Sequence, residues 1–284
     1  MLREISGTIG LLTDEHDFRT MRHYRSFAFD DYATYLAEVE DVLRARDAQG
    51  AFTMLTLFDP AEYAEFCAEQ GIDPDSPSSR ARFTAEIATT GAAIAYDGQP
   101  LTTVIPALMD QAVRSITWEL ASTLLARLGP CPNCGKDVGH EAFAYARDFL
   151  GRILDTAGPG RRQLVCSVSA TPESLVAVLR ADTDDYGATH LDDAEALEFT
   201  TVLALGLTSL PGGLVMRTIT PSGAERVCGW QLQAGEPAPL TAGEAFDAYC
   251  TDVDSGDPVA PESDVDYCAP PDLGPAAAGL RHHC

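Results

Sequence analysis

Lysine is almost missing from this chain. Lys136 is the only lysine among 19 basic residues, and 43 acidic residues bring the formal net charge to −24. Such a surface repels phosphate backbones and anionic membranes at long range, so we exclude nucleic-acid binding through a broad basic face. Two short basic groups, Arg19 to Arg25 and Arg161-Arg162, are interpreted as solvated surface. Arginine in place of lysine, with abundant alanine, predicts a GC-rich bacterial source.

Long apolar runs are also absent. The sequence has no run of about 18 apolar residues, and its first residues include acidic side chains and no apolar segment of signal-peptide length. We therefore expect no membrane span and a cytoplasmic location. The eight cysteines should then be reduced, which favours packing or metal binding over disulfides.

Recognisable catalytic motifs are the third absence. The sequence contains no G-x-S-x-G elbow, phosphate-binding loop, dinucleotide-binding glycine motif or H-E-x-x-H pair. An acid–base pair among the 43 carboxylates stays open, because sequence alone does not show which of them meet in the fold.

What the chain does have is periodicity and enough apolar residues, 45%, to fill a core. Helical spacing predicts helices that begin at Asp30 and at Asp59-Pro60, a helix through Phe83 and Ile87, and a long, mostly buried helix over 101–128. Alternation predicts strands at 23–29, 51–58, 92–96, 163–170, 214–220 and 226–232, with 174–181 either a strand or a helix.

These elements predict an α/β fold, with α+β as the alternative. We expect a helix-rich unit over 1–128, a unit with the knuckle, a helix and a small sheet over 129–234, and a low-complexity acidic tail over 235–284. The first two units either stand apart or pack as one domain. The tail is rich in Pro, Ala and Asp, so we expect it to be mobile.

The most specific local motif is Cys131-Pro132-Asn133-Cys134-Gly135. The proline fixes the backbone after the first thiolate, the two-residue spacing lets both sulfurs face one metal, and glycine permits a positive φ. This segment is similar to the knuckles of zinc ribbons. The resemblance covers five residues and implies a local shape, with no activity attached.

A zinc ribbon has a second Cys-x-x-Cys pair about 15 to 20 residues further on, and this chain has none. We take Cys131, Cys134 and His140 as candidate ligands of a structural zinc. The fourth ligand would come from the chain end, which offers His282, His283 and Cys284. The alternatives are a tight turn without metal and a redox-active cysteine pair. A redox-active pair has its first cysteine at a helix N-terminus, whereas glycines separate this pair from the next helix.

Residues 182–193 match an EF-hand calcium loop at four positions, but Tyr186 and the terminal Asp193 depart from the pattern. We interpret this run as an acidic loop that leads to a helix N-cap at Asp192 or Asp193.

The function we predict is that of a non-catalytic, cytoplasmic regulatory or adaptor protein that binds another protein. The first alternative is an enzyme with an unrecognised carboxylate or Cys/His site in a cleft between domains. A second alternative is an acidic mimic of nucleic acid. An exposed apolar patch around Trp118 would favour the partner-binding protein, and a deep pocket with titratable groups in opposed environments would favour the enzyme.

Overall fold

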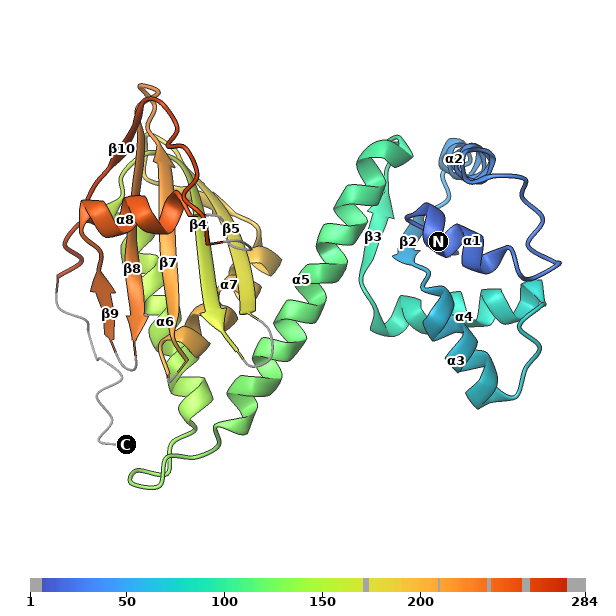
Figure 1. The fold of residues 1–284 in the computed structure, drawn as a ribbon, viewed down its shortest axis with the longest axis horizontal. Helices are drawn as coiled ribbons and strands as arrows, with labels where there is room; N and C mark the ends of the chain where they lie inside the picture. The colour runs from blue at the N-terminus through green and yellow to red at the C-terminus, as the bar shows by residue number, and fades with distance from the viewer. Residues whose placement is uncertain (1–6, 171–173, 209, 234–235, 252–255, 275–284) are drawn as a thin grey trace. The chain divides into compact units, whose positions relative to one another are not determined.

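The computed structural model describes residues 7–170, 174–208, 210–233, 236–251 and 256–274 (Figure 1). The chain divides into two compact units, Met1–Ile116 and Thr117–Cys284. The division falls inside helix α5 (Leu101–Arg127), whereas the sequence analysis places a boundary after residue 128. We call these the N-terminal unit and the C-terminal unit.

The N-terminal unit contains a three-stranded sheet in the order β1-β2-β3, in which β1 and β2 are parallel and β3 is antiparallel to β2. Its strands are β1 (Gly7–Leu11), β2 (Thr53–Leu57) and β3 (Ala93–Tyr96). Four helices complete it together with the first part of α5: α1 (Glu15–Met21), α2 (Tyr32–Ala48), α3 (Pro60–Gln70) and α4 (Pro77–Thr90).

Helix α3 begins and ends where the sequence predicts. Asp59 is its N-cap and accepts hydrogen bonds from the backbone N–H groups of Ala61 and Glu62, while Pro60 occupies the first turn. Gly71 ends the helix with φ 62°, a left-handed conformation that glycine adopts without steric cost. Cys67 on this helix is 2% exposed, which confirms its role in core packing.

The strand predicted over 23–29 is wrong, since this segment forms turns. Its aromatic residues pack sideways into a ring cluster instead of pairing with a strand. Phe27 lies against Phe18 and Tyr35, with ring centroids 5.7 and 5.8 Å away. The helix that follows is capped by Asp31, one residue later than predicted, because the Asp31 side chain accepts from the N–H of Thr34.

The C-terminal unit is built on a mixed sheet in the order β10-β8-β7-β4-β5-β6, with β9 paired to β8. Its strands are β4 (Gly160–Ser169), β5 (Ser174–Thr183), β6 (Thr189–Leu191), β7 (Gly212–Ile219), β8 (Glu225–Gln233), β9 (Glu236–Pro239) and β10 (Val265–Tyr267). Helices α6 (Val138–Thr156) and α7 (Asp193–Gly206) cover one face, and α8 (Ala242–Tyr249) lies on the other, over β7 and β8 (Figure 1).

Alternation of side chains explains this core. Every second residue of β4 and β5 is buried, so Leu164, Cys166 and Leu179 pack beneath α6 and α7. Residues 174–181, ambiguous in sequence, form the antiparallel partner of β4. Cys166 and Cys228 are buried thiols, as predicted. Burial raises the pKa of the Cys228 thiol to about 12, which keeps it protonated at neutral pH.

The chain is therefore an α/β protein with a helix-rich first half and a β-richer second half. Three elements, β9, α8 and β10, come from the segment that the sequence analysis assigns to the tail. Strands β9 and β10 are ordered by hydrogen bonds to β8, which the local composition does not reveal. None of the helices in the described ranges is long and apolar enough to cross a membrane.

Helix α5 differs from its prediction in one respect. Its first residues, among them Leu101 and Leu108, lie in the core of the N-terminal unit, and Ala121 and Leu125 lie in that of the C-terminal unit. Between these ends the apolar positions are exposed, so the expectation of a mostly buried helix is wrong. Helical spacing identifies an apolar face, but it does not show whether another element covers that face.

We predict that Tyr35 makes the N-terminal unit sensitive to alkaline pH. Burial raises the pKa of Tyr35 to about 12, and its hydroxyl accepts a hydrogen bond from the Leu12 N–H at 3.0 Å. Because the folded state favours the neutral phenol, this stabilisation is complete below the unfolded pKa of about 10 and is lost as pH rises through the folded pKa. The N-terminal unit should therefore be less stable at about pH 11 than at about pH 8.

Hydrogen exchange of the β1 and β2 amides at both pH values measures this loss. Tyr35→Phe should lower stability at about pH 8 by about 1 to 3 kcal/mol, because the Leu12 N–H is left without its acceptor, and should then change less with pH. Tyr186→Phe is the control, since Tyr186 is 97% exposed. If the stability of the Tyr35→Phe protein and that of the unmodified protein change equally with pH, Tyr35 is not the cause of the alkaline sensitivity.

Candidate functional site

The predicted zinc knuckle forms a closed turn between α5 and α6. The Cys131 N–H donates to the Lys136 carbonyl at 2.7 Å, and the Gly135 N–H donates to the Cys131 carbonyl at 2.8 Å. Pro130 and Asp137 form an isolated antiparallel bridge that closes the turn. Gly135 has φ 74°, the positive value for which the motif requires glycine. The backbone thus has the shape that the sequence motif predicts.

The three predicted ligands differ in their exposure and in their bonding. Cys131 is 3% exposed and disulfide-bonded, unlike the six free cysteines of the described ranges. Cys131 thus departs from the expectation of reduced thiols. Cys134 is an exposed free thiol. His140 is exposed in the first turn of α6, where its N–H donates to Asp137 at 2.8 Å.

No three His, Cys, Asp or Glu side chains in the described part of the chain are grouped so that they could hold a metal ion. The two cysteines share one turn, but His140 does not complete a metal-binding group with them. The further candidates His282, His283 and Cys284 lie outside the described residues. The run over 182–193, expected to be an acidic loop, contains the end of β5, a turn over 184–188 and strand β6, and Asp192 caps α7 as predicted.

A second site, which sequence reasoning missed, lies on the sheet face opposite α6 and α7. A pocket of about 390 Å³ opens over β4, β5, β6 and β7, and four arginines are among its lining residues. Gln163 on β4 pairs with Arg180 on β5 and with Arg217 on β7. In the next row Arg161 pairs with Asp182, which in turn pairs with His190. Alternation therefore brings these six side chains to one face.

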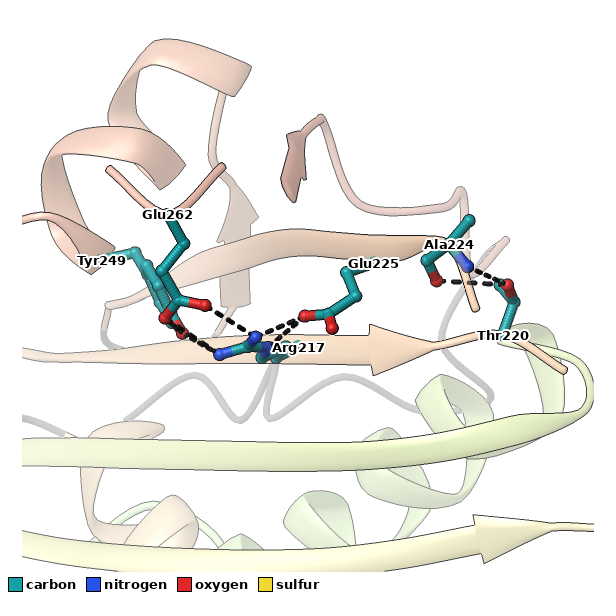
Figure 2. A network of polar contacts seen from close by, with 6 residues as sticks. All are labelled: Arg217, Thr220, Ala224, Glu225, Tyr249 and Glu262. Atoms are coloured by element: carbon teal, nitrogen blue, oxygen red, sulfur yellow. Dashed lines mark hydrogen bonds and ion pairs between the residues drawn. The ribbon is translucent and has the colours of Figure 1, made fainter. Parts of the chain in front are cut away.

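Arg217 is fully engaged in a network that ties the sheet to α8 and the following segment (Figure 2). Its Nε donates to Glu225 at 2.8 Å, Nη1 donates to Tyr249 at 2.7 Å and to Glu262 at 3.1 Å, and Nη2 donates to both carboxylates. A guanidinium has five N–H donors, and these bonds use all of them. Hydrogen bonding to Glu225 raises the pKa of Arg217 above its usual value.

The other arginines of this pocket are less engaged. Arg180 donates from Nη1 to Glu195 at 3.0 Å, although its side chain remains 64% exposed. Arg161 is exposed, and its side chain forms no hydrogen bond or ion pair within the described ranges. Its neighbour Arg162 is 3% exposed and donates from Nη1 to the Thr183 hydroxyl at 2.6 Å.

Two further nitrogens of Arg162, Nε and Nη2, are buried without a hydrogen-bond partner in the described structure. Burial lowers the pKa of Arg162, and the negative charge of Asp182 opposes that change. A buried guanidinium with unmatched donors costs free energy. The interpretation of Arg161 and Arg162 as a solvated run is therefore wrong for Arg162, because sequence does not reveal which face of a strand is covered.

Comparison with known proteins adds one finding. Residues 1–99 match a family model described as a domain of unknown function (DUF8829), which covers 99 of 284 residues and lies within the N-terminal unit. No curated protein and no solved structure matches the chain. Neither the knuckle nor the arginine pocket lies in the matched part.

We predict that Arg217→Met destabilises the C-terminal unit by about 2 kcal/mol, because two carboxylates lose their shared hydrogen-bond donor. Arg226→Met is the matched control on the adjacent strand. Its ion pair with Asp266 is 3.8 Å long with side chains 62% and 67% exposed, so the change should stay within about 0.5 kcal/mol. Urea unfolding followed by circular dichroism measures the free energy of unfolding of both variants. Equal losses in Arg217→Met and Arg226→Met would show that the network adds no stability.

Proposed function

We propose that the chain is a non-catalytic regulatory or adaptor protein that binds another protein through helix α5. The surface concerned is the α5 stripe, which we define as Met109, Val113 and Ile116, all in the N-terminal unit. The fractional exposures of these side chains are 47%, 63% and 66% in that order. This exposure of large apolar residues is the observation that carries the proposal.

The spacing of the α5 stripe supports one continuous contact surface. Steps of four and three residues place the side chains within an arc of about 60° on a helix with 3.6 residues per turn. Apolar residues scattered singly on a surface need no explanation, but a contiguous apolar row is typical of interaction sites. Recognition of a helix face by an apolar groove uses this spacing of anchor residues.

Trp118 does not belong to this surface. It is 40% exposed, but it lies roughly 160 to 180° around the helix from Met109 and Ile116, on the opposite face of α5. The charge of −24 argues against nucleic acid as the partner. We also propose a cytoplasmic location, which the six free thiols of the described ranges support and the disulfide at Cys131 does not.

The enzyme alternative receives less support. The arginine pocket contains His190 and Asp182, paired across β5 and β6, but its described lining includes no serine, cysteine or glutamate. A pocket dominated by guanidinium groups is suited to holding a negative charge, whereas a nucleophile with an adjacent base is the usual mark of covalent catalysis. Binding is therefore the chemistry that the pocket favours.

We also propose that the knuckle holds a structural zinc ion, with Cys131 and Cys134 as two of its ligands. The support is the hydrogen-bonded turn around Gly135, which places both cysteines on one short loop. Zinc binds thiolates, so the disulfide at Cys131 must be reduced before the ion can bind. His140 and the chain-end residues His282, His283 and Cys284 are the candidates for the remaining ligands.

Site-specific photo-crosslinking tests the proposed partner binding. A benzophenone side chain replaces Val113 in the full chain, and the protein is irradiated in its source cells. We expect one reproducible heterologous product, lost when Ile116→Glu is added, because desolvating the new carboxylate opposes binding. Leu197→Glu is the matched control, since Leu197 is an exposed apolar residue on α7. Crosslinks only between copies of this chain, or the same product from benzophenone at Arg82 on α4, would refute the proposal.

Native mass spectrometry of the reduced protein tests the zinc proposal. We expect one zinc ion per chain, removed by a chelator and absent from both Cys131→Ser and Cys134→Ser. Cys268→Ser is the control, because Cys268 is a free, half-buried thiol packed at the edge of the sheet core. A metal-free mass for the reduced, unmodified chain after incubation with zinc would rule the ion out.

A further inference from the structure

We infer that the arginine pocket of the C-terminal unit binds a small organic phosphate monoester. This inference is independent of the proposed partner binding, since it concerns a different surface. Three arginines carry it: Arg161 and Arg180 lie on the open sheet face, and the buried, incompletely bonded Arg162 also lines the pocket.

The first step is to identify the cations that a ligand can reach. Arg217 is excluded, since its donors are taken by Glu225, Glu262 and Tyr249. The Arg161 side chain has no partner within the described ranges. Arg180 uses Nη1 for Glu195, and its 64% exposed side chain keeps other donors available. Two guanidinium groups on adjacent strands can thus donate to one ligand.

Arg162 provides an independent argument. Strand alternation places its side chain on the helix-covered face, yet the residue also lines the pocket, and its guanidinium interacts electrostatically with Asp182 on the open face. Its Nε and Nη2 are buried without partners in the described structure. Fields act strongly across a low-dielectric interior, so an anion in the pocket would offset part of the cost of burying this cation. A protein without such a ligand has no evident benefit from keeping Arg162 charged.

The charge and size of the pocket indicate the ligand class. Guanidinium forks match phosphate oxygens in pairs, and a phosphate monoester carries close to two negative charges at neutral pH. Arg161, Arg180 and the buried Arg162 exceed the carboxylates Asp182 and Glu195 beside them in number, so the site keeps a net positive charge for an anion. A volume of about 390 Å³ exceeds what a bare phosphate fills and lies in the range of small-molecule sites. Ile219, paired with Arg161 on the same face, adds an apolar wall for an organic group.

Isothermal titration calorimetry on the full chain tests the inference with four probes: AMP, ribose 5-phosphate, inorganic phosphate and adenosine. We expect the two esters to bind more tightly than inorganic phosphate, and adenosine not to bind. Arg161→Met and Arg180→Met should each weaken ester binding about tenfold or more, as expected for loss of a charge-assisted hydrogen bond. Arg226→Met should leave it unchanged, because Arg226 lies on the same sheet outside the pocket.

Arg162→Met separates binding from folding. It should weaken ester binding while leaving the urea midpoint unchanged or higher, because replacing an incompletely bonded buried charge by an apolar side chain is often neutral or stabilising. The inference is overturned if neither ester binds at millimolar concentration, if Arg161→Met and Arg180→Met bind them like the unmodified chain, or if inorganic phosphate binds as tightly as the esters. Binding of adenosine alone would also overturn it.

Discussion

The C-terminal unit depends on the register of β4 between its two neighbours. Because β4 is paired on both sides, Leu164 lies opposite Leu179 and Met216 on the helix-covered face. A slip of one residue would exchange the two faces of the strand, exposing Leu164 and burying Arg161 and Gln163. Burial of unpaired polar groups costs several kilocalories per mole. The slipped register is therefore strongly disfavoured, because it would expose apolar side chains and bury polar ones. The arginine pocket is a direct result of this register.

Arg162 is the exception to that separation of polar and apolar faces. It occupies a core-facing position near the end of β4, where Thr183 supplies one hydrogen bond and Thr189 bonds to Thr183 in turn. Natural proteins often retain unfavourable local features where a site requires them. The same unit therefore combines a well-packed centre with a charged end, and a ligand pocket there is compatible with a regulatory role for the chain.

Local chemistry was sufficient to predict several elements. The Asp59-Pro60 start and Gly71 end of α3 follow from caps that involve only neighbouring residues. The positive φ of Gly135 follows in the same way from the knuckle motif. These features depend on a few consecutive residues, and a sequence contains that information directly.

Features that depend on distant residues were not predictable. The rings of Phe27 and Phe29 pack against Tyr35, so a segment with strand-like composition became a set of turns. The α5 stripe has the periodicity of a buried helix, and only the fold shows that these side chains lie outside the core of the N-terminal unit. The pocket required the register that aligns Gln163 with Arg180 and Arg217, and no single strand encodes that alignment.

The saturated guanidinium of Arg217 also affects how the protein can be shortened. Glu262 reaches it from beyond α8 and occupies donors on both terminal nitrogens. A chain that stops after α8 would lack this carboxylate and leave those donors facing the pocket. Such a truncation would turn a structural cation into an available one and alter the ligand preference of a surface far away in sequence. The segment after α8 therefore determines whether Arg217 on the sheet can bind a ligand.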